Sequence, residues 1–392
     1  MIETNFIDTE IGKVPADWMV VSLGEIGEVR MCKRVMKYQT SEKGEIPFFK
    51  IGTFGKTPDA YISRELYSSY KEKYNYPKKG DILLSAAGTI GRTVVFDGKP
   101  SYFQDSNIVW IENDEKKVYN ELLFYIYKNL SWVTESGTIP RIYNGIVRSI
   151  VFAIPSSLPE QRRIASALSS IDNLISALDK LIEKKCAIKT GTMQELLGGK
   201  RRVKGCEGEW KSVSIDEICN RLDNLRIPIS EVNRKHGTTP YYGANGIQDY
   251  VEGFTHNGEY ILLAEDGANS LVDYPIRYVS GKIWVNNHAH VLQAKEMRAD
   301  NKFLSYAFKN VDFESNIVGC GRAKLNSQTL MQLKIVIPSS LSEQRAIASV
   351  LTAMDDELAA LEAKKAKYVA LKQGMMQQLL TGKIRLIDSS AK

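Results

Sequence analysis

The chain has 392 residues, of which 43% are hydrophobic and 25% are charged, and it carries a formal net charge of +6. This length exceeds one ordinary core and predicts two or three domains, while the composition excludes a disordered or fibrous protein. The first ten residues are acidic and polar, and no apolar run approaches the roughly 18 residues of a membrane helix, so we expect a cytoplasmic protein without membrane contact.

Residues 1–153 are expected to form an irregular α+β domain. Short apolar runs bounded by turn residues predict strands, for example at Ile82–Leu84 and Thr93–Phe96. Basic and amide side chains in the predicted loops can bind phosphates or base edges. A solvated surface is the alternative for each cluster taken alone. The residues expected to contact DNA are Lys33, Arg34, Lys37, Arg92, Gln104, Arg141 and Tyr143.

Residues 154–204 are expected to form one long helix. Ser157 and Glu160 fit a capping box, in which both side chains satisfy free amides of the first turn. Apolar residues then recur at spacings of four and three, as in a coiled-coil seam. These seam residues are Ile164, Leu168, Ile171, Ile175, Leu178 and Ile182. Lys185 and Lys189 interrupt the stripe, and Gly199 can end the helix in a left-handed conformation.

Residues 205–336 are expected to form a second domain with the fold of the first. The stretch around Trp210 matches that around Trp18, and a further match links 120–129 with 301–310. The loops differ, so each domain is expected to recognise its own ligand site. The residues expected to contact DNA here are Arg226, Arg234, Lys235, Tyr242, Asn245, His288, Arg322 and Lys324.

Residues 337–392 are expected to repeat the long helix. The tract Ile337–Arg385 matches Ile154–Arg202 without a gap at 26 of 49 positions, whereas random alignment would give about three. A capping box recurs at Ser340 and Glu343. The seam residues are Ile347, Leu351, Met354, Leu358 and Leu361, with Lys365 and Lys372 interrupting. Burying both stripes together predicts an antiparallel pair with a near two-fold internal repeat, and ordinary bundle helices are the alternative.

No pattern in the chain predicts catalysis, nucleotide binding or a metal site. The sequence has no Pro-Pro pair for a methyltransferase loop, and neither Gly199-Lys200 nor Gly382-Lys383 continues as a phosphate-binding loop. The five cysteines are scattered, and His288-Ala-His290 lacks a third ligand at matching spacing. The first domain has Gln104 to Asn107 in the equivalent place, so these polar positions are expected to line a DNA groove instead.

Two similar domains with unlike loops suit a long ligand that has two different sites. Double-stranded DNA is such a ligand, because dimeric readers bind two half-sites at a spacing that protein geometry sets. Two unlike domains in one chain would read an asymmetric, interrupted site in the same way. The modest positive charge is compatible with a polyanionic partner.

The two helix starts resemble those of a known family. Ile-Pro-Ser-Ser-Leu-Pro-Glu-Gln-Arg162-Arg-Ile-Ala and Ile-Pro-Ser-Ser-Leu-Ser-Glu-Gln-Arg345-Ala-Ile-Ala look like the paired helix starts of the specificity subunit of type I restriction-modification enzymes. The resemblance covers the full chain, since the family's order of recognition domain, helix, recognition domain and helix is the order found here.

The resemblance implies an α+β protein with two target-recognition domains, separated by two long antiparallel helices, that does no chemistry itself. It would direct two methyltransferase subunits to a bipartite DNA site, where adenine is methylated at N6, and motor-nuclease subunits could join. S-adenosylmethionine, Mg²⁺ and ATP would belong to those partner subunits. The residues expected to dock partners are Glu160, Gln161, Arg162, Glu343, Gln344 and Arg345.

Two other interpretations stay open. The chain could be a non-catalytic assembly scaffold, or a stand-alone DNA-binding protein with no methyltransferase partner. Binding to random duplex over a salt series tests the scaffold interpretation, because phosphate contacts weaken steeply with salt. Co-purification with a methyltransferase tests the stand-alone interpretation.

Overall fold

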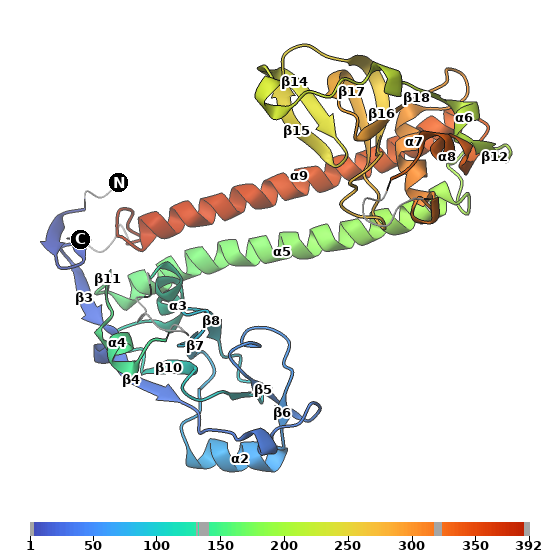
Figure 1. Ribbon diagram of the computed structural model, residues 1–392. Helices are drawn as coiled ribbons and strands as arrows, with labels where there is room; N and C mark the ends of the chain where they lie inside the picture. The colour runs from blue at the N-terminus through green and yellow to red at the C-terminus, as the bar shows by residue number, and fades with distance from the viewer. Residues whose placement is uncertain (1–3, 131, 133–140, 317–323, 388–392) are drawn as a thin grey trace. The chain divides into compact units, whose positions relative to one another are not determined.

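The computed structural model describes residues 4–130, 132, 141–316 and 324–387. The chain divides into two compact units, Met1–Leu178 with Lys364–Lys392, and Asp179–Ala363. The long helices α5 (Leu158–Leu197) and α9 (Leu341–Leu379) each contribute one end to each unit (Figure 1). The predicted α+β class with two long helices is therefore confirmed.

The first unit is built on a four-stranded antiparallel sheet with the strand order β4-β10-β7-β8. These strands are β4 (Gly27–Met31), β10 (Ile108–Asn113), β7 (Ile82–Ser85) and β8 (Thr93–Val95). The smaller sheets comprise β6 (Tyr61–Ile62), β5 (Ile46–Phe49) and β9 (Tyr102–Phe103), then β3 (Trp18–Ser22) with β11 (Val151–Pro155), and β1 (Phe6–Thr9) with β2 (Gly12–Pro15). The helices are α1 (Leu23–Ile26), α2 (Arg64–Lys73), α3 (Asn120–Asn129) and α4 (Asn144–Ser149).

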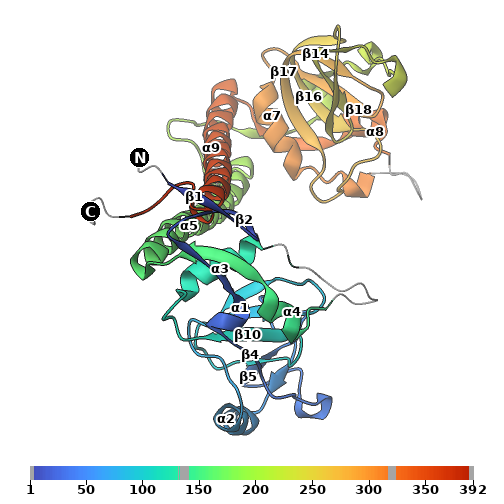
Figure 2. The ribbon, with the colours of Figure 1, turned by 90° about the vertical axis from the view of Figure 1, so that its left-hand side faces the viewer.

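Both faces of the four-stranded sheet are buried. Successive side chains of a strand point to opposite faces, so neighbouring residues join different cores. Leu83 and Trp110 join a core with β5, β9 and α2. Ile82 and Ile111 join a second core with α1, α3, α4 and the start of α5. Figure 2 shows β10 and β4 between α1 and α4 on one side and β5 and α2 on the other.

The second unit contains a six-stranded sheet with the strand order β13-β18-β16-β17-β14-β15. These strands are β13 (Cys219–Arg221), β18 (Ala289–Ala294), β16 (His256–Ala264), β17 (Ile276–Val285), β14 (His236–Gly243) and β15 (Gly246–Val251). The other elements are β12 (Trp210–Ser214) paired with β19 (Lys334–Pro338), and the helices α6 (Ile215–Ile218), α7 (Asn301–Ala307) and α8 (Ser327–Gln332).

The two domains share one connectivity, since β13-β18-β16-β17 repeats the order β4-β10-β7-β8. An isolated bridge pairs Ala87 with Arg141 in the first domain, and Asp266 with Lys324 in the second. The residue before each bridge donates its amide to an equivalent carbonyl, that of Asn107 or that of His288, at 2.8 Å in both cases. These hydrogen bonds allow the polar residues of the two domains to be matched one by one.

Within the first unit, α5 and α9 pack as antiparallel segments. Ile164, Leu168, Ile171 and Leu178 of the predicted seam are buried there. Lys372, one of the lysines that interrupt the stripe, donates to Asp172 across the pair at 2.5 Å. The Tyr125 and Tyr127 rings come from α3, and the Tyr125 hydroxyl donates to Asp172 at 2.9 Å. The lysine therefore ties the two helices to the domain instead of weakening the seam.

The second unit repeats this arrangement with exchanged helices. Lys189 of α5 pairs with Asp355 of α9, and the Tyr306 hydroxyl donates to the same carboxylate at 2.6 Å. Lys185 pairs with Glu357 at 2.6 Å. The seam lysines thus bond acidic side chains of the facing helix, while their aliphatic stems lie along the pair.

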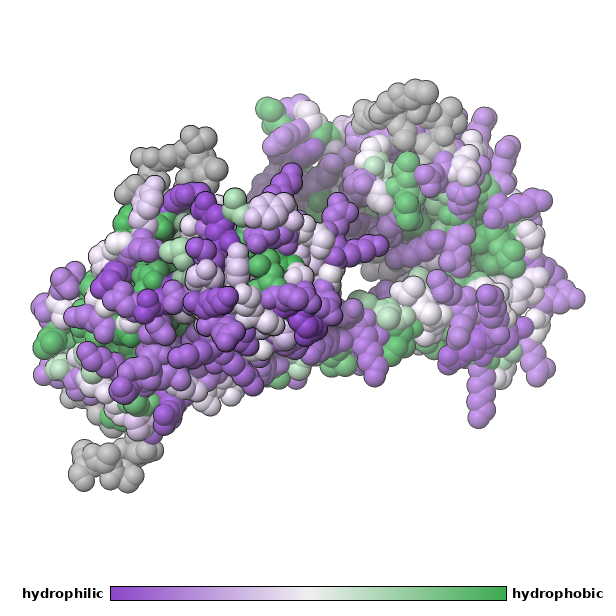
Figure 3. Space-filling model, turned by 90° about the horizontal axis from the view of Figure 1, so that it is seen from below, coloured by the Kyte–Doolittle hydropathy of each residue, from purple (hydrophilic) through white to green (hydrophobic). Residues whose placement is uncertain are grey.

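In the part of the chain that the structure describes, every helix falls short of the length or the apolarity that crossing a bilayer demands. Hydrophilic residues cover most of the face shown in Figure 3, with hydrophobic residues scattered among them.

Candidate nucleic-acid interface

Four residues expected to contact DNA in the first unit line a single cleft of about 600 Å³. Arg34 and Lys37 come from the segment after β4, and Lys37 opens a short 3₁₀ helix. Gln104 lies in the turn between β9 and β10, and Arg141 forms the isolated bridge with Ala87. The cleft thus gathers the guanidinium, ammonium and amide donors that phosphates and base edges accept.

Hydrogen bonds within the protein hold several polar groups of the cleft in place. Gln104 Oε1 accepts a 2.9 Å bond from the Ile51 amide, and Arg34 Nε donates to Asp105 at 2.8 Å. Asn107 also lines the cleft, as the sequence predicts for a polar groove, and its buried Oδ1 has no hydrogen-bond partner among the described residues. A buried acceptor without a partner costs free energy, which the rest of the fold must offset.

Three other residues expected to contact DNA in the first unit lie outside this cleft. Lys33 Nζ lies 5.1 Å from the ring centre of Tyr74, in a cation–π contact. Arg92 donates to the Phe54 carbonyl at 3.0 Å and so braces a loop. Tyr143 is exposed at the N-terminal cap of α4. Contact of these three side chains with DNA stays a prediction.

In the second unit, Arg226 is largely buried and engaged within the protein. Its guanidinium donates to Glu265 at 2.7 Å and to the Ala289 carbonyl at 2.8 Å, and it lies 3.7 Å from Asp223. These bonds attach the segment after β13 to the start of β18. Arg226 therefore shapes the surface where DNA contact is expected, and its Nε and Nη1 donors are already occupied.

Arg234 also forms its contacts within the domain, whereas the Lys235 side chain is exposed. The Arg234 guanidinium lies 4.5 Å from the ring centre of Tyr241 and donates to Asp249 at 3.4 Å. Lys235 follows at the start of the strand region, with its side chain exposed. Of these two neighbours, Lys235 is the one with a freely accessible charge.

Tyr242 and Asn245 belong to the hairpin of β14 and β15. Tyr242 packs partly buried against a small core, and burial raises the pKa of its hydroxyl. Asn245 is exposed, but its side chain donates to the Gly267 carbonyl at 2.9 Å and accepts from the Asn269 amide at 2.9 Å. Asn245 therefore joins two loops of the domain, and its reading of a base stays a prediction.

His288 and Lys324 lie on neighbouring parts of the second domain and each has an acidic partner. His288 Nδ1 lies 2.6 Å from Asp266, and Lys324 Nζ lies 2.8 Å from Glu265. The hydrogen bond to Glu265 raises the pKa of Lys324, which keeps it positively charged. Arg322 lies outside the described residues.

The histidine that lies near two carboxylates is His290, whose Nδ1 is 2.7 Å from Asp223 and 3.6 Å from Glu265. Its ligand atoms and those of Asp223 and Glu265 all lie within 4.8 Å of one another, a grouping with the donor types of a metal site. However, Arg226 and Lys324 already donate to oxygens of Glu265. The protein itself supplies the positive charge here, so the geometry favours an ion-pair network over a metal site.

The pKa values of the two carboxylates near His290, Asp223 and Glu265, are both lowered. Burial tends to raise the pKa of Asp223, but the hydrogen bond and charge of His290 outweigh burial and hold that pKa below its usual value. Burial likewise opposes the effect of Lys324 and Arg226 on Glu265, whose pKa is also lowered. Both carboxylates are therefore ionised at neutral pH.

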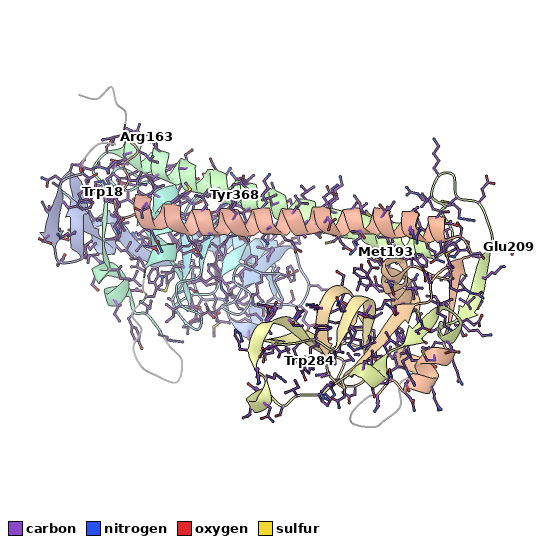
Figure 4. All side chains as sticks on the ribbon, turned by 90° about the horizontal axis from the view of Figure 1, so that it is seen from above. Trp18, Arg163, Met193, Glu209, Trp284 and Tyr368 are labelled. Atoms are coloured by element: carbon purple, nitrogen blue, oxygen red, sulfur yellow. The ribbon has the colours of Figure 1, made fainter. Side chains whose placement is uncertain are left out.

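The residues expected to dock partners include a buried pair at the start of α5. Both carboxylate oxygens of Glu160 accept from Arg385, at 2.7 and 2.8 Å, instead of capping the first turn as predicted. Gln161 is also buried, and it accepts from the Tyr119 amide and donates to the Pro155 carbonyl, both at 2.8 Å. Trp18 and Arg163 lie at this same end of α5 (Figure 4).

The start of α9 repeats these contacts in the second unit. Glu343 accepts from Arg202 at 2.5 and 2.7 Å, and Gln344 accepts from the Asp300 amide at 2.9 Å and donates to the Pro338 carbonyl at 2.9 Å. The arginine that follows the C-terminal end of one long helix thus binds the glutamate in the first turn of the other.

This burial corrects the expectation that the Glu-Gln pairs dock a partner. Glu160, Gln161, Glu343 and Gln344 are at most 1% exposed and are bonded within the chain, so they have no surface to offer. Arg162 and Arg345 are exposed, and partner contact through them stays a prediction.

Sequence reasoning missed the two arginines, although a signal was present. Arg202 and Arg385 hold the last position of the duplicated tract, and each lies over a tryptophan at an equivalent domain start, Trp210 at 6.0 Å and Trp18 at 5.7 Å. An arginine recurs at the end of both tracts, and a glutamate recurs near the start of both. In an antiparallel pair of helices, these positions come close together, so the repeat indicates the two Arg–Glu ion pairs.

A family model described as the type I restriction modification DNA specificity domain matches residues 15–185 and 207–370. A protein named as a type I restriction enzyme specificity subunit of Haemophilus influenzae is 58% identical over 160 residues, which span 41% of each chain. A protein named as the MjaX specificity subunit of Methanocaldococcus jannaschii is 24% identical over 98% of this chain and 97% of its own length.

A solved structure shares the fold. The S subunit of a type I restriction-modification system from M. genitalium superposes with a TM-score of 0.66 at 16% identity, covering 92% of this chain and 96% of that one. The likeness therefore extends over both domains and both long helices.

Proposed function

The chain belongs to the family of type I restriction-modification specificity proteins, and from this premise we propose that it selects a bipartite, asymmetric sequence in double-stranded DNA for a methyltransferase complex. Each domain would read one half-site. The chain itself would be non-catalytic, and S-adenosylmethionine, Mg²⁺ and ATP would be bound by partner subunits. Motor-nuclease subunits would join the complex where DNA is also cut.

The observation that carries this proposal is one fold with two different polar surfaces. The isolated bridge bears Arg141 in the first domain and Lys324 in the second. The neighbouring residue of the bridge partner bonds a matched polar residue, Asn107 or His288. Around these positions, the side chains differ in size, charge and hydrogen bonding. A shared scaffold with unlike donors at the same place is what two different half-sites require.

Sequencing of N6-methyladenine in the genome of the native host tests the proposal. Deleting the gene for this chain should abolish methylation at one interrupted, asymmetric motif and leave other motifs unchanged. Restoring the gene should restore that motif with the same gap. Methylation that does not change on deletion would contradict the proposed role, as would loss of a continuous palindromic motif.

We also propose that partners dock on the outward faces of the long helices. Leu181 and Ile188 lie seven residues apart on α5 and are both exposed, although they are large and apolar. A spacing of seven places them on one side of the helix. Such a stripe is suited to cover by a helix from a methyltransferase subunit.

Replacing both apolar residues with aspartate tests this docking surface. The double variant Leu181→Asp/Ile188→Asp should lose co-purification with the methyltransferase and keep its own unfolding temperature. Replacing the exposed lysine between them, as Lys184→Asp, is the matched control, because it adds an acid without removing apolar surface. Equal loss of partner with the control would refute a role for the apolar stripe.

A salt series separates DNA binding from a purely structural role. Phosphate contacts predict that log K falls with log salt, with a slope of about −0.9 for each phosphate neutralised. An assembly scaffold that binds only protein would show no such slope. A clear slope with no methyltransferase in the purified complex would favour a stand-alone DNA-binding protein.

A further inference from the structure

The ion-pair network of the second domain occupies a place that is apolar in the first domain. We define this network as Asp223, Arg226, Glu265, His290 and Lys324. The strand registers make the matching explicit, because Val109 lies opposite Leu84 and His290 lies opposite Leu263 in equivalent strand pairs.

The matched residues of the first domain form a small apolar cluster. Val109 and Ala86 are buried together, with Met31 packed against them. The β4–β10 register pairs Met31 with Val109, and extending the β13–β18 register by two residues places Asp223 opposite His290. The amide bonds of the bridge match Ala86 with Glu265. Apolar side chains therefore satisfy the shared fold at all three positions.

Since the fold does not need charges here, the network must serve something particular to the second domain. Replacing a buried ion pair by apolar residues is often neutral or stabilising, so stability does not explain its presence. Its members are strongly interlinked. His290 lies with Nδ1 2.7 Å from Asp223 and with Nε2 2.9 Å from the Leu325 carbonyl.

The exposed end of the network is Lys324, at the place that Arg141 holds in the first domain. The Lys324 side chain is 55% exposed, whereas its partner Glu265 is 12% exposed. Lys324 bonds Oε1 of Glu265, and Arg226 bonds the other carboxylate oxygen, Oε2. Arg141 has no ion pair among the described residues and lines its cleft. Among the described residues, the first domain thus presents a cation without an ion pair at this place, whereas the second presents one that is held by Glu265.

We propose that this network is a positioning site that directs Lys324 toward an acceptor edge of a base, as guanine presents with O6 and N7. This inference rests on the proposed function of reading DNA. Lys324 is the specificity-determining contact, and Glu265 is a positioning residue that acts through it. A free lysine would bind phosphates without regard to sequence, whereas a lysine held by Glu265 selects the base that it faces.

Selection from a pool of randomised duplexes, with the full chain in the complex purified from its host, tests this proposal. The wild-type protein should enrich two half-sites at a constant gap. Lys324→Ala and Glu265→Gln should each lower the preference for guanine at one position of one half-site by about ten-fold, with the other half-site unchanged. Lys211→Ala, which removes another ion-paired surface lysine of this unit, is the matched control and should change neither.

Two further measurements separate positioning from folding and from plain charge. Lys324 is exposed enough that its removal should leave the unfolding temperature unchanged, and Glu265→Gln keeps the shape of the side chain. Affinity for random duplex should fall with Lys324→Ala but not with Glu265→Gln, because only the former removes a positive charge.

The outcomes distinguish this inference from the function on which it rests. If the wild-type complex enriches no sequence, the proposed function and this inference both fall. If it enriches two half-sites and both variants keep every base preference, only the inference is overturned. Loss of preference in both half-sites, or at no guanine, would also overturn it.

Discussion

Removing Glu160 should destabilise the first unit strongly, because it strands a buried guanidinium. The Arg385 side chain is 7% exposed and that of Glu160 is 2% exposed. The hydrogen bonds of Arg385 to Glu160 and Asp17 hold its pKa above the usual range. Breaking a buried ion pair by deleting one partner costs about 3–5 kcal/mol. Asp17 still binds Arg385 through two bonds of 2.6 and 2.7 Å, so we expect Glu160→Ala to cost about 3 kcal/mol, at the lower end of this range.

Urea unfolding followed by tryptophan fluorescence measures this cost. With a slope of about 2 kcal/mol per molar urea, the transition of the first unit should move down by about 1.5 M. Hydrogen exchange should show the loss at the first turns of α5. Glu343→Ala is the matched control in the second unit, and it should cost less because the Arg202 side chain is 31% exposed and can turn to water.

A double variant completes the comparison. Glu160→Ala/Arg385→Ala removes both charges, so it should be less destabilised than the sum of the two single variants by more than about 1 kcal/mol. A cost of Glu160→Ala no greater than that of Glu343→Ala would refute the burial reasoning, and additive single variants would refute the pairing itself.

Three more predictions follow from the structure. Gly382→Ala should destabilise more than Gly199→Ala, because both glycines have left-handed φ angles of +69° and +67° but an added Cβ would lie 2.3 Å from a proline carbon only at Gly382; equal melting temperatures would contradict this. Tyr306→Phe should cost about 1–2 kcal/mol in urea unfolding, since it removes a 2.6 Å bond to the Asp355 carboxylate, and a loss below about 0.5 kcal/mol would count against that bond. Because the folded pKa of Asp223 lies below 3.8, its stabilisation is complete above that pH and is lost as the pH falls through the lowered value; Asp223→Asn should flatten this acid dependence in a pH series of thermal unfolding, and an unchanged acid slope would speak against it.

The sequence by itself determined the architecture of this protein. The ungapped repeat at 26 of 49 positions and the 3.5-residue period specify two long helices, because a helical seam is a local pattern that each tract carries within itself. The repeated domain starts around Trp18 and Trp210 likewise indicated two copies of one fold, and β3 and β12 bear that out. The polar stretch Gln104 to Asn107, which the sequence places in a DNA groove, lines a cleft of the first unit, and DNA binding there stays a prediction.

Only the tertiary structure decided which charges pair. Glu160 fits a capping box locally, yet it binds Arg385, which lies 225 positions away. The seam lysine Lys372 has its partner 200 positions away, and it stabilises a contact that the helix period alone marks as a flaw. His290 meets its acidic partners only when β18 is laid beside β16 and the segment after β13. Coulomb interaction and hydrogen bonding depend on distance in space, and spacing along the chain carries that distance only within a helix or a strand.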